Sequence, residues 1–303
     1  MKFVITGGTG FLGSALLNKC IEDKHGILLL TRKPRALSDL EKIYVEVAQW
    51  DGRTLGPWVQ RMEEADAIIN FAGESIGGGR WTQGRKERII NSRLNATKVL
   101  IEAVGKLSKK PNVLINASGV GYYGVDVQNE VTETSPSGND FLAQVCTRWE
   151  QEASKAEDLG LRVVRFRNGV VLEKNGGALK KMIFPYLFFI GGTLGSGQQW
   201  FPWIHREDLM QIIYYTIKNS QVRGPINVVA PEIVTMKQFC KALGKAMHRP
   251  SLMTVPDFVL RMLFGEMADM ILTGQRAIPK KLQEAGFKFK YPTIESALRT
   301  IFA

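Results

Sequence analysis

The sequence predicts an α/β fold, with a doubly wound parallel sheet and a smaller C-terminal lobe that binds substrate. Short, continuous aliphatic runs alternate with amphipathic helical stretches through the first half of the chain, and a glycine-rich turn separates the first run from the first helical stretch. Continuous aliphatic strands are typical of parallel sheets that are covered by helices on both faces. We therefore expect the sheet domain over residues 1–172 and the lobe, interleaved with it, over residues 173–303.

The expected elements follow one another as strand and helix. The strands are the aliphatic runs Lys2–Thr6, Ile27–Thr31, Tyr44–Ala48, Ala67–Phe71, Val113–Asn116 and Arg162–Phe166. Apolar residues recur with a helical period in Gly13–Asp23, Arg85–Leu107 and Phe141–Asp158. Beyond residue 172 the pattern loosens into glycine-rich turns, and a last helix is expected over Asp257–Thr273.

Composition narrows the classes of protein that fit. The 303 residues are 45% hydrophobic and 23% charged, which excludes a disordered chain, a collagen and a disulfide scaffold. The net charge of +11 attracts anions, which leaves nucleic acid, an anionic membrane or a phosphorylated small molecule as partners. The basic residues are dispersed and no nucleic-acid-binding motif accompanies them, so we expect no nucleic-acid partner.

Cysteine usage and hydropathy indicate the compartment. Cys20, Cys146 and Cys240 lack C-x-x-C spacing, which favours a reducing compartment and no metal site. The longest apolar stretch, Met182–Ile190, is far shorter than the roughly 20 residues that a membrane span needs. We expect a cytoplasmic protein without a membrane partner.

The glycine-rich turn has the spacing of a dinucleotide-binding loop. Gly7, Gly10 and Gly13 follow G-x-x-G-x-x-G spacing between the first strand and the first helix. In a Rossmann fold, such glycines allow the tight turn, the close approach of a pyrophosphate and the packing of helix on strand. The helix N-terminus then offers its amides to the phosphates. We predict that Gly7, Gly10, Phe11, Leu12 and Gly13 bind a nucleotide.

The end of the second strand indicates which nucleotide. NAD sites usually place an acidic residue there to bind the ribose 2′-hydroxyl. This chain has instead a cationic cluster, Thr31-Arg32-Lys33-Pro34-Arg35, which suits a 2′-phosphate unless it is only a solvated basic loop. We predict NADP(H) as cofactor, with Thr31 and Arg32 on the 2′-phosphate. Asp51 either lies near the adenine or serves the Asp51-Gly52 turn.

At this point the residues resemble a known family. Thr6–Gly13 together with Asn70–Glu74 resembles the short-chain dehydrogenase/reductase superfamily, and residues 195–208 resemble its extended, sugar-nucleotide-epimerase-like branch. Further motifs are similar to an atypical epimerase-like NAD(P)-binding family with members from bacteria to human and a poorly defined role; they lie at residues 72–74, 80–81, 121–124, 149–150, 195–198 and 274–289. The resemblance covers nearly the whole chain.

The resemblance implies a nicotinamide-dependent enzyme with a Ser–Tyr–Lys set. Ser118 matches the serine, whereas the Tyr-x-x-x-Lys pair has no match, because Phe141 and Val145 align with it. Phenylalanine has no proton to give, and valine has no charge with which to lower the pKa of a tyrosine. The usual acid/base machinery of the superfamily is therefore missing.

Other cofactor contacts follow from the resemblance by position. Phe71, Ala72 and Gly73 are expected along the pyrophosphate and ribose. Arg93 either reaches the cofactor or lies on the helix surface, and Glu87, six residues earlier, is a weaker candidate. Val171 follows the sixth strand, where relatives pass the nicotinamide.

A replacement acid/base group is expected near Ser118. Tyr122 and Tyr123 follow it in the loop at the carboxyl end of the sheet, where ligands bind, although each could simply pack under that loop. Glu74 and His205 are further candidates; their alternative roles are an ion pair or helix cap for Glu74 and the start of a helix for His205. We list Ser118, Tyr122 and Tyr123 as candidate catalytic residues.

The segment from Gly176 to Trp203 is the candidate substrate pocket. It is rich in glycine and aromatic residues, which line a pocket or fill a core, and Lys180 and Lys181 suit an anionic substrate. Two functions fit the whole pattern. The first is an NADP(H)-dependent, epimerase-like oxidoreductase with an unidentified small-molecule substrate, and the second is a non-catalytic NADP(H)-binding sensor or scaffold.

Overall fold

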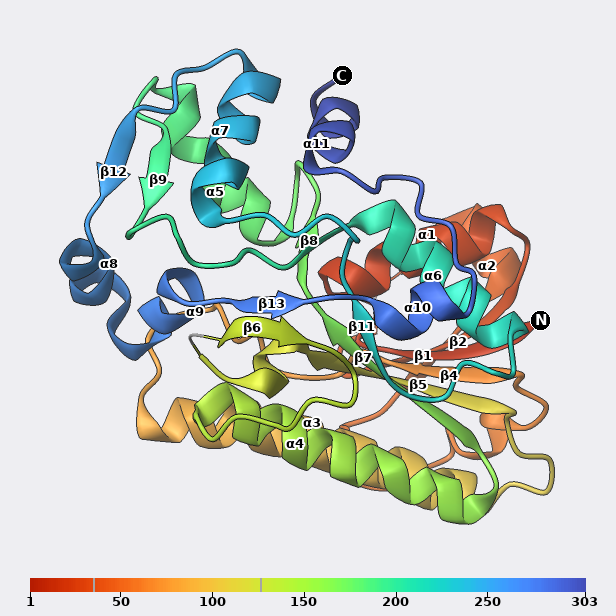
Figure 1. The fold of residues 1–303 in the computed structure, drawn as a ribbon. Coiled ribbons are helices and arrows are strands. Elements are labelled where there is room, and N and C mark those ends of the chain that lie inside the picture. The colour runs from red at the N-terminus through yellow and green to blue at the C-terminus, as the bar shows by residue number, and fades with distance from the viewer. Residues whose placement is uncertain (35, 126) are drawn as a thin grey trace.

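The computed structural model describes residues 1–34, 36–125 and 127–303. A seven-stranded parallel sheet forms its centre (Figure 1). In spatial order its strands are β3 (Val45–Gln49), β2 (Gly26–Thr31), β1 (Lys2–Thr6), β4 (Ala67–Asn70), β5 (Val113–Gly119), β7 (Arg162–Asn168) and β11 (Gly224–Val228). The order reverses direction between β1 and β4, which is the switch point of a doubly wound sheet. The predicted fold class is confirmed.

All the expected strands are present, but two of them run further than the aliphatic pattern. β5 continues through Ser118 to Gly119, and β7 continues through Arg167 to Asn168. Polar residues extend these strands because their side chains find partners inside the protein, where an unpaired polar group would be costly. β11 was not expected at all. It pairs with β7 although it follows residue 172, and the division at residue 172 remains a proposal.

Helices cover both faces of the sheet. α1 (Phe11–Glu22) and α6 (Arg206–Lys218) lie on one face, and α3 (Gln83–Val104) and α4 (Phe141–Ser154) lie on the other (Figure 1). Successive strand residues point to opposite faces, so Phe3 and Ile5 belong to the core under α1, whereas Val4 belongs to the core under α3. The short helix α2 (Asp39–Tyr44) begins with a capping box at Ser38.

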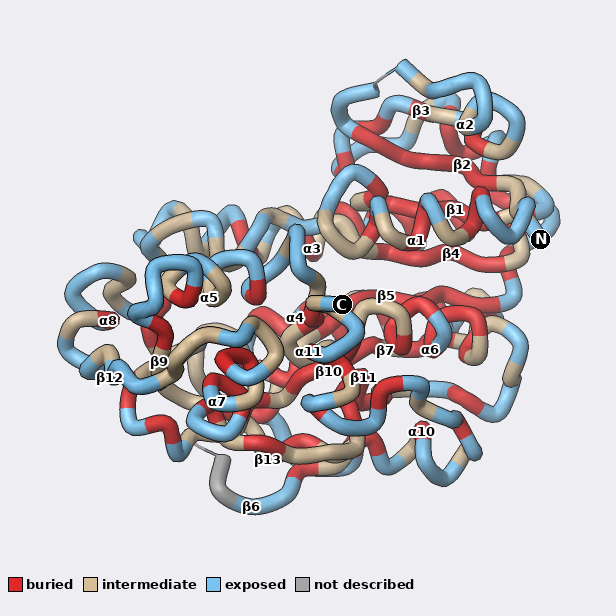
Figure 2. The backbone as a smooth tube through the Cα atoms, turned by 90° about the horizontal axis from the view of Figure 1, so that it is seen from above, coloured by how far each residue is buried: buried red, intermediate tan, exposed pale blue. Residues whose placement is uncertain are grey.

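The C-terminal lobe consists of short elements beside the sheet (Figure 2). Three pairs of parallel strands lie outside the main sheet: β10 (Trp203–His205) with β8 (Val170–Leu172), β12 (Met253–Val255) with β9 (Gly192–Leu194), and β13 (Gln275–Ala277) with β6 (Val127–Val131). The longer helices of this part are α5 (Gly177–Leu187), α7 (Met236–Met247) and α11 (Ile294–Phe302), and the short α10 spans Lys280–Glu284.

The prediction of one continuous helix over Asp257–Thr273 is wrong. α8 (Asp257–Phe264) ends at Gly265, whose φ of +59° is a left-handed conformation that glycine adopts at little cost. A 3₁₀ turn follows, and then the short helix α9 (Asp269–Leu272). Among the described residues, no helix is long and apolar enough to cross a membrane.

The surface of the lobe is unusually apolar in two segments. Their exposed side chains are Phe184, Leu187, Phe188, Phe189, Ile190, Leu252, Met253, Phe258, Met262, Leu263 and Met270. Other aromatic residues of the candidate pocket segment lie in the core instead, namely Tyr186, Phe201 and Trp203. The aromatic stripe is therefore divided between the core and the surface.

Candidate functional site

The glycine loop is packed so tightly that its spacing has a direct steric cause. A Cβ atom on Gly7 would lie 2.6 Å from the carbonyl oxygen of Phe71, and Gly7 has a φ of +66°. A Cβ atom on Gly13 would lie 2.2 Å from the carbonyl oxygen of Gly7. The amide of Gly10 donates to that same oxygen at 2.9 Å. The loop thus brings the end of β1, the end of β4 and the start of α1 together.

The N-terminus of α1 is suited to an anion. Gly10 is its N-cap residue, and within the described chain no side chain caps this end and no acidic residue lies in the first turn. The first amides of a helix have no partner inside the helix and carry the positive end of its dipole. Gly10 uses its amide inside the loop, so the amides at the start of α1 that remain for a pyrophosphate are those of Phe11, Leu12 and Gly13.

The other expected cofactor residues border this surface. A Cβ atom on Gly73 would lie 3.0 Å from the guanidinium carbon of Arg93, so the segment Phe71–Gly73 runs directly over that side chain. The ring of Phe11 packs against Gly176, and a Cβ atom on Gly177 would lie 3.3 Å from the carbonyl oxygen of Val171. The structure therefore brings together the residues from the loop, from the end of β4 and from β8.

Arg93 is a buried cation without a counterion. Its side chain is 7% exposed, Nη1 donates to the carbonyl oxygens of Glu74 and Ile89 at 3.0 Å, and its guanidinium stacks over Trp149. Nε has no hydrogen-bond partner, and no carboxylate pairs with this guanidinium among the described residues. Burial lowers the pKa of Arg93 to about 10, so the side chain stays charged at neutral pH. A buried, unpaired charge is costly, which favours an anion beside it.

The end of β2 carries the predicted 2′-phosphate residues. Thr31 is buried, and its Oγ1 lies 3.4 Å from the amide of Lys33. Arg32 is exposed and, within the described part of the chain, pairs with no carboxylate. Arg35, the last cation of the expected cluster, lies outside the described residues.

Two acidic candidates have hydrogen-bond partners inside the protein. The Asp51 carboxylate accepts hydrogen bonds from the amides of Arg53 and Thr54, which hold its pKa below the usual value, so it serves the turn. Glu87 is exposed on α3, where it accepts a hydrogen bond from Gln83. The structure does not bring Glu87 to the glycine loop.

A buried polar network that the sequence did not reveal joins the ends of three strands. Thr6, Asn70 and Asn116 occupy neighbouring positions on β1, β4 and β5. The Thr6 hydroxyl donates to the side-chain oxygen of Asn70. The side-chain NH2 group of Asn70 donates to Asn116 at 2.6 Å and to Thr97 on α3 at 2.9 Å. The side-chain oxygen of Asn70 also accepts a hydrogen bond from the backbone amide of Ala72. This network fixes the segment that passes over Arg93.

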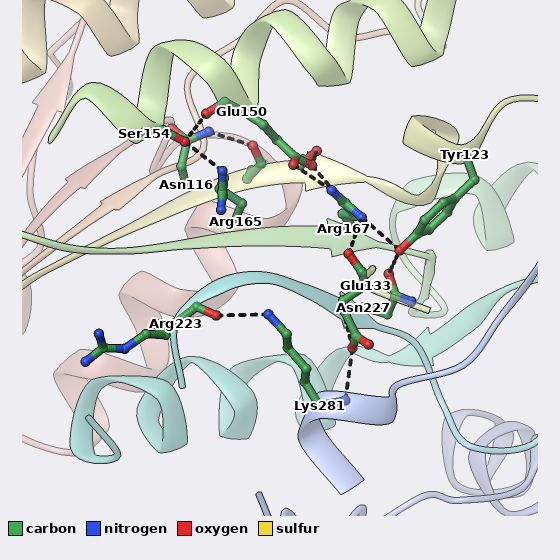
Figure 3. A network of polar contacts seen from close by, with 12 residues as sticks. Asn116, Tyr123, Glu133, Glu150, Ser154, Arg165, Arg167, Arg223, Asn227 and Lys281 are labelled. Carbon is green, nitrogen blue, oxygen red and sulfur yellow. Dashed lines mark hydrogen bonds and ion pairs between the residues drawn. The ribbon is translucent and has the colours of Figure 1, made fainter. Parts of the chain in front are cut away.

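Ser118 lies in a second polar network. This network is also at the carboxyl edge of the sheet, on the side of β5 and β7. Its hydroxyl donates to Glu150 on α4 at 2.7 Å. The Glu150 carboxylate accepts two hydrogen bonds from Arg167 on β7, at 2.9 Å each, in a forked ion pair that is almost fully buried (Figure 3). The serine that the family resemblance assigns to catalysis therefore hydrogen-bonds a carboxylate in this structure.

The two candidate tyrosines also contact Arg167. The Tyr123 hydroxyl donates to Asn227 at 2.6 Å and accepts from Arg167 at 3.0 Å (Figure 3), and burial raises its pKa to about 12. The ring of Tyr122 stacks on the same guanidinium at 3.4 Å from ring centre to Cζ. The structure thus gathers Ser118, Tyr122 and Tyr123 around one ion pair.

The helix face turned toward Ser118 differs from the expected alignment. Cys146 interacts with the Ser118 hydroxyl and the Gly119 amide, and a Cβ atom on Gly121 would lie 3.2 Å from Leu142. Phe141 instead packs against Trp81, on the side of α3. The residues opposite Ser118 are therefore Leu142 and Cys146, one position beyond the Phe141 and Val145 that we aligned. Leucine has no proton to give, and burial raises the pKa of the Cys146 thiol to about 11.

The remaining acid/base candidates have structural roles. Glu74 pairs with Arg88 at 3.3 Å and with Arg85 at 3.8 Å. His205 is the N-cap residue of α6: its Nδ1 accepts from the amide of Glu207, and burial lowers its pKa to about 4. Of the pocket lysines, Lys181 donates to the Gly77 carbonyl at 3.1 Å. Among the described residues, no group of His, Cys, Asp or Glu side chains could hold a metal ion.

The switch-point sheet and the glycine loop define a dinucleotide-binding protein of the epimerase type. Comparison with known proteins agrees: the chain belongs to the NAD dependent epimerase/dehydratase family, whose model matches residues 3–229. Residues 255–301 match a domain of unknown function, DUF1731. The family resemblance expected from the motifs is confirmed.

Relatives come from a bacterium, a plant and human. Epimerase family protein YfhF of Bacillus subtilis is 42% identical, over 100% of this chain and 98% of its own. The chloroplastic SDR39U1 homologue of Arabidopsis thaliana is 40% identical, over 99% of this chain and 86% of its own. A crystal structure of human epimerase family protein SDR39U1, isoform 2, with NADPH has a TM-score of 0.88 and 32% identity, and covers 100% of this chain and 99% of that one.

Proposed function

We propose that the chain binds NADP(H) and acts as an epimerase-type oxidoreductase on a small-molecule substrate. One observation carries the choice of cofactor: Arg32, exposed and without a carboxylate partner in the described chain, stands where NAD-binding proteins place an acidic residue. The NADPH in the crystal structure of the human relative supports the same choice.

The residues around the loop fit this cofactor in size and charge. The amides of Phe11, Leu12 and Gly13 would hold the pyrophosphate, with Gly10 shaping the turn before them. Thr31 and Arg32 would hold the 2′-phosphate, and Arg93, which lies under Gly73, would face the negative charge of the bound cofactor. The unpartnered Nε of Arg93 supports this assignment, because a buried donor without a partner is rare in a folded protein. When bound, the nicotinamide supplies the hydride, and the protein positions it and moves a proton.

Proton transfer is the step that distinguishes this chain from its superfamily. The hydroxyls of Ser118 and Tyr123 donate to Glu150 and Asn227, whereas the hydroxyl of Tyr122 has no hydrogen-bond partner in the described chain. We therefore keep Tyr122 as the first candidate for the proton donor. The same hydrogen bonds favour a second candidate function, a non-catalytic NADP(H)-binding sensor or scaffold.

Fluorescence titration with NADPH and NADH tests the cofactor assignment. We expect the wild-type protein to bind NADPH at least tenfold more tightly than NADH, because the guanidinium and the 2′-phosphate form a charge-assisted pair. Arg32→Glu should abolish this preference and leave NADH binding nearly unchanged. Arg148→Glu, which makes the same charge change on the exposed side of α4, is the control. Equal affinities of the wild type for the two nucleotides would contradict the assignment.

A turnover screen separates the two functions. Carbonyl compounds and sugar nucleotides are offered with NADPH or NADP⁺, and the nicotinamide absorbance is followed. Turnover that is lost in Tyr122→Phe supports the oxidoreductase with Tyr122 as donor. Tight NADPH binding without turnover across a broad panel supports the sensor.

A further inference from the structure

A cavity lies on the α4 side of the sheet, away from the glycine loop. It has a volume of about 510 Å³ and is lined by α4, β7, the start of β11 and the loop around Glu133. Tyr122 and Arg167 form one part of its wall, and Arg165, Thr147 and Ser154 form another. None of the glycine-loop residues takes part in it.

Strand geometry places two arginines in this wall. Arg165 and Arg167 lie two positions apart on β7 and therefore point to the same face of the sheet. Arg167 is neutralised by Glu150. Arg165, beside it in Figure 3, makes one hydrogen bond, from Nη1 to the Ser154 hydroxyl at 2.6 Å, and pairs with no carboxylate in the described chain.

The surroundings of Arg165 carry charges of both signs. The wall of the cavity holds two guanidiniums, Arg165 and Arg167, and two carboxylates, Glu133 and Glu150. Glu150 pairs with Arg167, and the carboxylate of Glu133 accepts hydrogen bonds from two backbone amides (Figure 3). Arg165 is therefore the cation of this wall that forms no ion pair with a carboxylate in the described chain.

Two polar atoms near the cavity have no partner. The Nε of Arg165 and the Oγ1 of Thr147 are both buried and make no hydrogen bond. A guanidinium beside a hydroxyl is an arrangement that recognises oxygen anions, because each can donate a hydrogen bond to a separate oxygen atom. A bound anion would satisfy donors that the protein leaves unpaired.

We propose that this cavity is a second binding site, which takes a small oxyanion, such as a carboxylate or a phosphate group, on Arg165. The Thr147 hydroxyl is its second donor, and the guanidinium of Arg165, which no carboxylate of the described chain pairs with, holds the ligand. The cavity shares no residue with the glycine loop, and of the candidate catalytic residues only Tyr122 lines it, so that NADP(H) and the oxyanion bind at the same time.

Calorimetric titration of the whole chain, saturated with NADPH, tests the proposal with two probes, inorganic phosphate and malonate. We expect saturable binding of at least one of them at constant ionic strength. Binding of phosphate alone would assign a phosphate group, binding of malonate alone a carboxylate, and binding of both a general oxyanion site. Arg165→Gln should weaken the binding at least tenfold, whereas Arg148→Gln, an equal charge loss on the exposed side of α4, should not change it.

Thr147→Val is a second, milder variant for the case in which Arg165→Gln does not fold, and it should weaken the binding by several fold. The proposal is overturned if neither probe binds saturably, or if Arg165→Gln and Thr147→Val, both folded, bind like the wild type. It is also overturned if the probes bind only when NADPH is absent, because they would then occupy the cofactor site.

Discussion

The carboxyl edge of the sheet has two halves, which differ in whether their polar groups have partners inside the protein. At β1, β2 and β4, the start of α1 is uncapped, and Arg32 and Arg93 pair with no carboxylate in the described chain. At β5, β7 and β11, by contrast, the hydroxyls of Ser118 and Tyr123 hydrogen-bond to protein groups. The open half offers positive groups to a ligand, whereas in the closed half the hydroxyls of the two candidate catalytic residues already have partners, and Arg165 is the cation without a carboxylate partner in the described chain. Cofactor binding and structural stability should therefore respond to different substitutions.

The largest effect is expected in the closed half. Glu150→Gln would leave the Arg167 guanidinium buried without a counterion, and breaking a buried ion pair costs about 3–5 kcal/mol of the free energy of unfolding. Urea denaturation measures the loss. NADPH affinity of the folded variant should stay within about twofold, since no residue of the open half contacts Glu150.

The control for Glu150→Gln is Glu152→Gln on the same helix. Glu152, 15% exposed, pairs with Lys155, 61% exposed, so water screens one side of this i,i+3 pair and its loss should cost about 1 kcal/mol. A large fall in NADPH affinity for Glu150→Gln would show that the two halves are coupled, contrary to the comparison.

Gly13→Ala should produce the opposite pattern in the open half. The added Cβ would lie 2.2 Å from the Gly7 carbonyl oxygen, a backbone atom that yields only if the loop moves. We expect a stability loss of about 1–3 kcal/mol, as for other overpacking changes, and at least a tenfold loss of NADPH affinity. Thermal unfolding and fluorescence titration measure the two effects.

Gly84→Ala, near the start of α3, is the matched control, because its Cβ would meet only the tip of Arg88, at 3.9 Å. It should leave NADPH affinity unchanged and should raise stability by at most about 1 kcal/mol, because alanine is the better helix former. If Gly13→Ala bound NADPH as tightly as the wild type, the glycine loop would not be the cofactor site.

A pH dependence of stability, absent near neutral pH, is expected at His205. Its pKa in the folded protein, about 4, lies below the unfolded value of about 6.5, so the folded state favours neutral histidine. This contribution to stability is present above pH 6.5 and is lost as the pH falls toward 4, by at most about 1.4 kcal/mol per pH unit. His205→Asn keeps a good N-cap but does not titrate, and should flatten the loss of stability between pH 6.5 and 4.

His248→Asn is the control for that measurement. His248 is exposed and ends α7 with a φ of 53°, a conformation that asparagine tolerates. Its acid unfolding should match that of the wild type. If His205→Asn lost stability as steeply as the wild type, another group would be responsible for the pH dependence.

The sequence predicted the parts of the molecule that local pattern controls. The aliphatic runs indicated six strands of the sheet, and the glycine spacing has the steric cause that we expected. β11 was missed because its run, Gly224–Val228, is short and begins with Gly and Pro, which are unfavourable in strands. The break at Gly265 was missed because the apolar pattern continues across it.

Side-chain partnerships were harder to predict, because they join residues distant in the chain. The sequence did contain a signal, because Arg165 and Arg167 lie in an otherwise buried strand and buried charges need partners. Only the fold shows that Glu150 pairs with Arg167 and that no carboxylate in the described chain pairs with Arg165. The alignment of α4 was wrong by one residue because a helix turns by about 100° per residue, and only contacts show which face meets Ser118.

The late arrival of β11 has a consequence for the growing chain. Until residues 224–228 have been synthesised, β7 is the edge of the sheet, and its unpaired amides and carbonyls are open to other chains. Arg162, Arg165 and Arg167 place positive charges along that temporary edge, and charged side chains discourage edge-to-edge pairing. Two of these arginines, Arg165 and Arg167, line the cavity in the finished protein, so the same charges would serve the edge strand before β11 exists and the cavity afterwards.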